Sequence, residues 1–238
     1  MKKIIWVAGG LIILLAMVAV FYYFVLRADT SSRSANVIEW IKHPQDHPDW
    51  SISAKEQCPG AVFLMPTSGF IGYLWDDSFR PGHRHSGLDI FGDSQPGITP
   101  VYAVMDGYLT RENEWKSSII IRIPEDPLSP NHQIWTYYTH MADKDGNSFI
   151  DSKFPPGTNE VFVKAGTLLG TMGNFSGTVG SPTGIHLHFS IVKDDGAGNY
   201  LNELEIENTI DPSPYFQIEL NARNNPTETP LCGLQSNG

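Results

Sequence analysis

Hydrophobic and polar residues divide the chain into regions of different texture. Residues 4–26 form an apolar run without a single charge. At a rise of about 1.5 Å per residue, a helix of this length crosses a hydrocarbon core of about 30 Å. Short polar residues follow at 28–36, and beyond residue 61 brief β-branched and aromatic segments alternate with turn residues. The pattern predicts a single membrane helix, a linker and a β domain.

The third region predicts an all-β fold. Strands are expected at 61–65, 98–104, 107–111, 118–123, 133–139, 161–163, 167–172 and 186–193. Because no segment of comparable length keeps a helical period, we expect a compact antiparallel β-sheet rather than parallel βαβ units. Gly 22, Pro 17 and 11% aromatic residues agree with a turn-rich β protein.

The residues around the apolar run predict its orientation. Lys2 and Lys3 precede it, residues 21–24 are all aromatic, and no small-x-small cleavage site follows. These features predict an uncleaved single-pass helix in the cytoplasmic (inner) membrane, with its N-terminus inside and the remaining chain extracytoplasmic or periplasmic. A signal peptide that is removed is the alternative.

The predicted organisation is a membrane anchor at 1–27, a juxtamembrane linker at 28–60, a globular domain at 61–220 and a C-terminal extension at 221–238. Within the linker a short helix is expected from Val37 onward. The His43-Pro44 and His47-Pro48 pairs then interrupt it. The two histidines have the spacing of helical metal ligands, but the prolines break that geometry, so both are interpreted as surface residues.

Charge and cysteine usage narrow the function classes. The formal net charge is −10, which argues against a nucleic-acid partner because such binding needs a basic surface. The two cysteines, Cys58 and Cys232, are too far apart in sequence for a CxxC redox or zinc pair. Outside the cytoplasm, such a pair is a candidate disulfide.

Four histidines and one aspartate lie in or beside predicted strands: His85, Asp89, His140, His186 and His188. Residues two apart in a strand face the same side, and two buried imidazoles on one face usually share a divalent metal. Catalytic zinc takes three protein ligands and leaves one position for water. The two surplus side chains would serve as general base and transition-state stabiliser. Spacing alone leaves open which two these are.

The ordered motifs resemble those of lysostaphin/LytM-type zinc endopeptidases, which cut the peptide part of bacterial peptidoglycan. The H-x-x-x-D stretch from His85, the Y-x-H ending at His140 and the HLHF from His186 occur in family order over residues 66–216. The resemblance implies a LytM-type, β-sandwich-like antiparallel fold. It also implies one Zn²⁺ per chain held by His85, Asp89 and His188, with His140 and His186 as the catalytic pair.

Some residues depart from the family pattern. The loop at 173–185 is longer than usual, Ile185 replaces a common proline, and Ser190 stands where an acidic residue often follows. The segment at 142–160 is a further insertion that we expect to form a groove wall. None of these changes removes a predicted ligand, so they bear on the shape of the groove and on the bond that is cut.

Other side chains have alternative interpretations. His83 could replace His85 as a ligand, but only His85 has the right offset to Asp89, so His83 is expected at the rim and His132 in solvent. Tyr73 or Tyr138 could donate a hydrogen bond to an oxyanion. The residues Asp143, Asp145, Asn147 and Asp151 resemble part of a Ca²⁺-binding loop. The glycine and glutamate expected in such a loop are absent, so an acidic surface turn is the preferred interpretation.

Three functions follow from these patterns. The first is a membrane-anchored zinc metalloendopeptidase whose partners are peptidoglycan peptide and, through residues 4–26, the membrane. The second is a non-catalytic cell-wall-binding or hydrolase-activating regulator. Such regulators typically lack ligands that this chain keeps. The third is a zinc hydrolase that acts on an exported protein.

Overall fold

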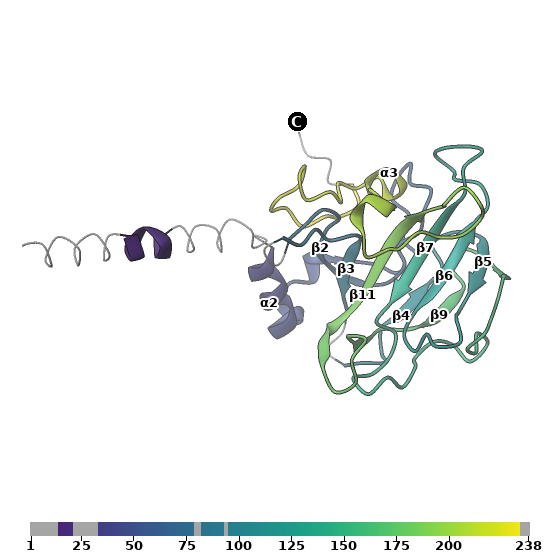
Figure 1. Ribbon diagram of the computed structural model, residues 1–238, viewed down its shortest axis with the longest axis horizontal. Helices are drawn as coiled ribbons and strands as arrows, with labels where there is room; N and C mark the ends of the chain where they lie inside the picture. The colour runs from purple at the N-terminus through teal and green to yellow at the C-terminus, as the bar shows by residue number, and fades with distance from the viewer. Residues whose placement is uncertain (1–13, 21–32, 79–81, 93–94, 234–238) are drawn as a thin grey trace, which may run out of the picture.

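The computed structural model describes residues 14–20, 33–78, 82–92 and 95–233. The fold is built on one large sheet of ten strands in the order β1-β2-β3-β11-β7-β6-β5-β8, and β10 and β12 also pair with β11. All of its strand pairs are antiparallel. A second, small sheet consists of β4 and β9. The predicted antiparallel β architecture is therefore confirmed (Figure 1).

The strands are β1 Ser51–Ile52, β2 Gly69–Tyr73, β3 Leu88–Phe91, β4 Pro100–Tyr102, β5 Gly107–Thr110, β6 Ile119–Ile123, β7 Ile134–Thr139, β8 Val161–Val163, β9 Leu168–Thr171, β10 Gly173–Phe175, β11 Pro182–Lys193 and β12 Thr209–Ile210. The helical elements are α2 Ser34–Lys42, the 3-10 turns η1 Pro44–Asp46, η2 Pro48–Trp50 and η3 Ile206–Asn208, and α3 Ser213–Phe216.

One predicted strand is wrong. Residues 61–65 form no strand, although Phe63 and Met65 are buried in the core. The N–H groups of residues 62 and 63 both donate to the Tyr215 carbonyl, and that of Leu64 donates to the Val104 carbonyl. This segment therefore satisfies its backbone without a ladder. In contrast, β2 and β3 are strands that the sequence pattern did not predict.

The two faces of the large sheet have different roles. Leu187, Phe189 and Ile191 of β11 belong to the main core, together with Val101 of β4 and Leu169 of β9. The small sheet thus packs against this core face. Because side chains alternate along a strand, His186, His188 and Ser190 lie on the opposite face. The candidate site is built on that face.

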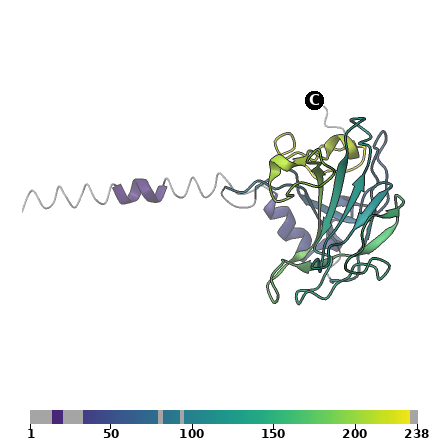
Figure 2. The same cartoon turned by 45° about the vertical axis from the view of Figure 1, so that its right-hand side comes forward.

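The N-terminal segment is part of the folded domain. Helix α2 begins at Ser34, earlier than expected, and ends at Lys42, before the first proline. Its Val37 and Trp40 form a second buried cluster with Phe70 and Phe91 of β2 and β3. Figures 1 and 2 both show α2 against this side of the domain, with β5 at the opposite edge.

Arg33 fixes the start of α2. Its side chain is 1% exposed. Nη2 donates to the Asn225 carbonyl oxygen at 2.8 Å, to Asn225 Oδ1 at 2.8 Å and to the Glu228 carbonyl oxygen at 2.6 Å. Burial lowers the pKa of Arg33 to about 10, although Asp77 and Glu228 oppose that shift. The chain just before α2 is therefore joined to the C-terminal segment.

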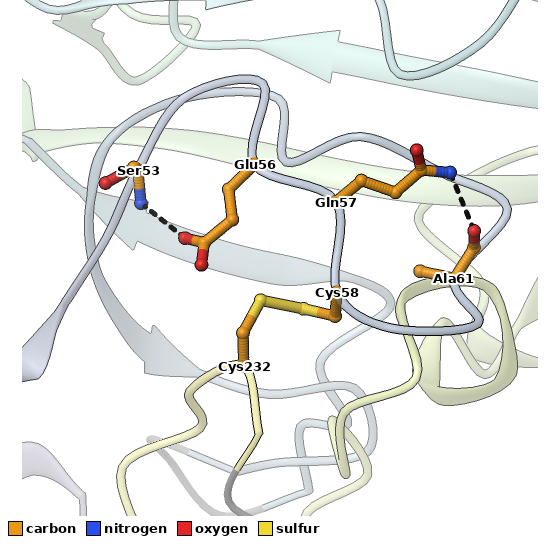
Figure 3. Close-up of a disulfide and its surroundings, with 6 residues drawn as sticks. All are labelled: Ser53, Glu56, Gln57, Cys58, Ala61 and Cys232. Atoms are coloured by element: carbon orange, nitrogen blue, oxygen red, sulfur yellow. Dashed lines mark hydrogen bonds between the residues drawn. A yellow bond between two sulfur atoms is a disulfide. The ribbon is translucent and has the colours of Figure 1, made fainter.

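The predicted disulfide is confirmed. Cys58 and Cys232 are bonded, with their Cα atoms 5.2 Å apart and a sequence separation of 174 (Figure 3). The loop around Cys58 is closed by its own polar groups. Gln57 Nε2 donates to the Ala61 carbonyl oxygen at 2.7 Å, and the Ser53 N–H donates to Glu56 Oε2 at 3.2 Å.

Among the described residues, no helix is both long and apolar enough to cross a membrane. Residues 14–20 are helical, and the rest of the predicted anchor at 4–26 lies outside the described residues. The anchor therefore stays a prediction.

Candidate metal centre

Strand pairing brings the first two candidate ligands together. Asp89 of β3 stands opposite His188 of β11, and Asp89 Oδ1 lies 2.9 Å from His188 Nδ1. His85 precedes β3, and its Nε2 lies 3.1 Å from the same carboxylate oxygen and 3.0 Å from His188 Nδ1. These three are the one group of potential metal-ligating residues found within the described part of the chain.

Hydrogen bonds set the protonation of the cluster. His85 Nδ1 lies 2.8 Å from the Leu74 carbonyl oxygen, which can only accept, so Nδ1 carries the proton and Nε2 presents a lone pair. His188 Nε2 lies 2.9 Å from Ser190 Oγ. When that nitrogen donates to the hydroxyl, His188 Nδ1 is also a bare acceptor. Each histidine thus has the outer partner that metal-bound imidazoles usually have.

The donor set fits a divalent cation. Two imidazole lone pairs and a carboxylate oxygen converge on one point, where they repel one another unless a positive charge lies between them. Burial disfavours ionisation of Asp89, but when His85 and His186 carry a proton, their charge and the hydrogen bonds from His188 and His85 outweigh burial and hold the pKa of Asp89 well below the usual range. Two nitrogens and one carboxylate oxygen are a ligand set that suits catalytic zinc.

His140 and His186 lie beside this cluster as a pair, with ring centroids 4.4 Å apart. His140 Nδ1 donates to the Phe175 carbonyl oxygen at 2.6 Å, and His186 Nδ1 donates to the Gly184 carbonyl oxygen at 2.8 Å. Both Nε2 atoms are therefore proton acceptors. His186 Nε2 lies 3.6 Å from Asp89 Oδ1.

Burial is the main reason why both histidines of this pair are neutral. It lowers the pKa of His140 to about 4, helped by the proximity of His186, and it also lowers the pKa of His186. His140 has a φ of 71°, in the left-handed region that residues other than glycine rarely adopt. Such strain is concentrated at functional sites.

A groove of about 680 Å³ contains the cluster and the histidine pair. One side is apolar and includes Ile38 and Ile41 of α2, which are 53% and 51% exposed. The other side carries hydroxyl groups and Glu203. The contribution of α2 to a wall of this groove is not predicted by the sequence pattern.

Several sequence candidates lie away from the ligand cluster. His83 lines the groove with its ring centroid 6.4 Å from that of His85, and it is not part of the three-residue group. His132 is exposed and pairs with Ser129 Oγ at 3.1 Å. His43 is exposed, and His47 stacks on Trp50 with centroids 3.9 Å apart.

The two tyrosine candidates lie on different faces of the sheet. Tyr138 is fully buried on the core face, and its hydroxyl accepts a hydrogen bond from the Val104 N–H at 3.1 Å. Tyr73 lines the groove, and its hydroxyl lies 3.0 Å from Ser34 Oγ of α2. Of the two, Tyr73 is the one whose side chain is at the site.

The acidic loop at 143–151 is closed by its own side chains. Asp143 Oδ1 accepts hydrogen bonds from the N–H groups of Asp145 and Asn147, both at 2.9 Å, and Asp143 Oδ2 accepts one from Asn147 Nδ2 at 2.7 Å. Asp151 Oδ1 accepts a bond from the Lys153 N–H at 2.9 Å. These bonds agree with an acidic surface turn, and the calcium site stays an untested alternative.

Sequence reasoning missed the groups that orient the histidines. Three of them are the backbone carbonyls of Leu74, Phe175 and Gly184, which carry no side-chain signature. It also missed the hydroxyl groups near His140. The alternation of side chains along a strand could have indicated them. Tyr137 and Thr139 lie on one face of β7, and the pairing of β7 with β11 places that face on the same side of the sheet as His188.

No family model and no curated protein matches the sequence. Solved structures with a similar fold include proteins described as peptidases. Csd3 from Helicobacter pylori is 20% identical, with a TM-score of 0.40 over 66% of this chain and 35% of that protein. The antimicrobial peptidase lysostaphin from Staphylococcus simulans is 21% identical, with a TM-score of 0.36 over 56% and 44%. A zinc-containing peptidase from Vibrio cholerae is 18% identical, with a TM-score of 0.35 over 63% and 40%.

The chain thus spans between about a third and a half of the length of these neighbours. The His85, Asp89 and His188 cluster has the arrangement that the H-x-x-x-D and H-x-H motifs predict. The function below is inferred from the side chains of the site.

Proposed function

We propose that this chain is a zinc metalloendopeptidase that hydrolyses peptide bonds in bacterial peptidoglycan. The observation that carries the proposal is the convergence of His85 Nε2, Asp89 Oδ1 and His188 Nδ1 within hydrogen-bond distance of one another. Zinc held there would lower the pKa of a bound water to about 7 and polarise the scissile carbonyl.

His140 and His186 suit the proton transfers. Each has Nδ1 bonded to a backbone carbonyl, so each accepts a proton at Nε2 without turning its ring. Burial keeps both neutral near pH 7, which is the state required of a general base. The protonated ring then returns the proton to the leaving amine. Tyr73 lines the same groove and can donate a hydrogen bond to the developing oxyanion.

The size of the groove supports a peptide substrate. It has a volume of about 680 Å³ and walls from segments far apart in sequence. We further propose that residues 4–26 hold the chain in the cytoplasmic membrane, facing the cell wall. The apolar run supports this placement. Fractionation tests it, because an anchored chain stays with the membranes after a carbonate wash.

The peptidase activity is tested with the full-length chain and purified peptidoglycan, with and without a zinc chelator. We expect new amines that the chelator abolishes. His140→Gln and His186→Gln should keep one zinc per chain and lose release, whereas the exposed control His132→Gln should leave release unchanged. Release at the normal rate from either groove variant would overturn the assigned pair. No release from zinc-loaded wild-type chain would favour the regulatory alternative.

A further inference from the structure

A row of side chains crosses the groove face of the sheet and continues beyond the metal centre. Asp89 faces His188, and His188 in turn faces Thr139 in β7. Thr139 Oγ1 lies 2.6 Å from Ser118 Oγ, just before β6. Hydroxyl groups therefore begin directly beside a candidate ligand, on the side away from α2.

Tyr137 extends this row. It lies two residues before Thr139 and so on the same face, and its hydroxyl donates to Ser118 Oγ at 2.9 Å. Burial and then the neighbouring Glu203 carboxylate raise the pKa of Tyr137 to about 12. Three hydroxyls and one carboxylate thus share a corner of the groove, and all four residues line it.

Glu203 brings a negative charge to this corner. In the described part of the chain it forms no ion pair with a lysine, arginine or histidine. The opposite wall is apolar, with Ile38 and Ile41 of α2. A substrate lying across the metal centre therefore meets hydrocarbon at one end, and a carboxylate with hydroxyls at the other.

We propose that Glu203, Ser118, Tyr137 and Thr139 form a subsite for a primary ammonium group of the substrate. This inference rests on the proposed peptidase function. An ammonium group has three donors and no acceptor, so it requires several oxygen acceptors and, away from water, a compensating negative charge. Each hydroxyl oxygen has two lone pairs and keeps acceptor capacity beyond its bond to a neighbour. The charge of Glu203 favours an ammonium group over a neutral sugar.

The ammonium group can come from the α-amine of a peptide or from an amino side chain such as that of lysine. Three versions of one lysine-containing peptidoglycan peptide separate these sources: one with both amines free, one acetylated on the α-amine and one acetylated on the side chain. The full-length, zinc-loaded chain is tested on each for kcat/KM. Equilibrium binding of the same peptides to the His140→Gln variant examines the subsite without turnover.

We expect acetylation of one of the two amines to reduce kcat/KM and binding about tenfold or more, the effect of losing one charge-assisted contact. Glu203→Gln should remove this discrimination. The matched control Glu205→Gln makes the same charge change two residues away, at an exposed side chain hydrogen-bonded to Asn208, and should keep it.

The outcomes separate the two proposals. Equal cleavage of all three peptides by wild-type chain, or discrimination that survives in Glu203→Gln, would overturn the ammonium subsite and leave the peptidase intact. Binding that discriminates between the peptides without any cleavage would retain the subsite and overturn the peptidase. Loss of both cleavage and binding would reject both.

Discussion

Asp89 and His188 face each other across two adjacent antiparallel strands, with Oδ1 and Nδ1 2.9 Å apart. The pairing of β3 with β11 therefore brings together two of the three candidate ligands. Any slip in that register would separate them, because a one-residue shift turns every side chain to the other face. A metal ion bound by both side chains would therefore be thermodynamically coupled to the correct pairing of these strands.

This coupling predicts that zinc stabilises the fold. Free zinc at one hundred times its Kd should raise the free energy of unfolding by about 2.7 kcal/mol. His188→Ala should abolish the zinc-dependent increment, measured by chemical denaturation with and without zinc. His132→Ala changes an exposed histidine away from the cluster and should keep it. A zinc increment that persists in His188→Ala would place the metal elsewhere.

Ser190 should affect metal affinity without being a ligand, because its Oγ lies 2.9 Å from His188 Nε2. Ser190→Ala removes that partner, and we expect zinc affinity to fall about 10- to 100-fold. Competition with a chelating indicator measures the change. The matched control is Ser129→Ala, since Ser129 is bonded to a histidine outside the site. An unchanged affinity in Ser190→Ala would mean that the hydroxyl does not orient the ring.

The buried, neutral state of His140 predicts an acid-sensitive fold. Its pKa is about 4 in the folded chain, with burial as the main cause, against an ordinary value of 6.5. Between these values the unfolded chain binds more protons, so the free energy of unfolding decreases as pH falls from about 6.5 to about 4. By pH 4.5 this one group should remove about 2 kcal/mol.

The comparison that tests this prediction is wild-type chain against His140→Gln, unfolded with denaturant at pH 7 and pH 4.5. The variant has no titrating ring at this position and should lose less stability over the interval. Parallel losses in the two proteins would show that acid acts through other groups.

Arg33 should contribute to both stability and activity. Arg33→Met removes three hydrogen bonds, two of them to the buried Asn225 and one to the Glu228 carbonyl oxygen. We expect a loss of about 2–3 kcal/mol in the free energy of unfolding. Because α2 lines the groove, KM should also rise. Lys42→Met, at the exposed end of the same helix, is the control and should change neither quantity.

Sequence reasoning succeeded where alternation and motif order carried the information. The motif order predicted the His85, Asp89 and His188 cluster, and the alternation of apolar and polar residues predicted five of the ten strands of the large sheet, namely β5, β6, β7, β8 and β11. It failed for residues 61–65, where apolar residues fill the core while their N–H groups bond to separated segments. The local alternation of apolar and polar residues does not indicate hydrogen bonds to such distant segments. The tyrosines illustrate the same limit, since choosing between Tyr73 and Tyr138 required knowing which face of the sheet holds the core.

The N-terminal segment was the least predictable part. Its polar residues indicated a linker, but Arg33 is buried through contacts with residues nearly two hundred positions away. Contacts between residues so far apart in sequence cannot be predicted from the spacing of residue types along the chain. The apolar face of α2 was visible in Val37, Ile38 and Ile41, yet only the fold reveals that Val37 is buried while the two isoleucines border the groove.

The position of Arg33 also limits how far the groove can lie from a membrane that holds residues 4–26. If the chain leaves the bilayer near residue 26, only residues 27–32 separate that surface from the first fixed point of the domain. Fully extended, six residues cover at most about 20 Å. The groove would then be confined to the layer of cell wall nearest the membrane. Peptides would have to enter that layer to be cut. The distance from the membrane at which each molecule can act would be determined by one short stretch of chain.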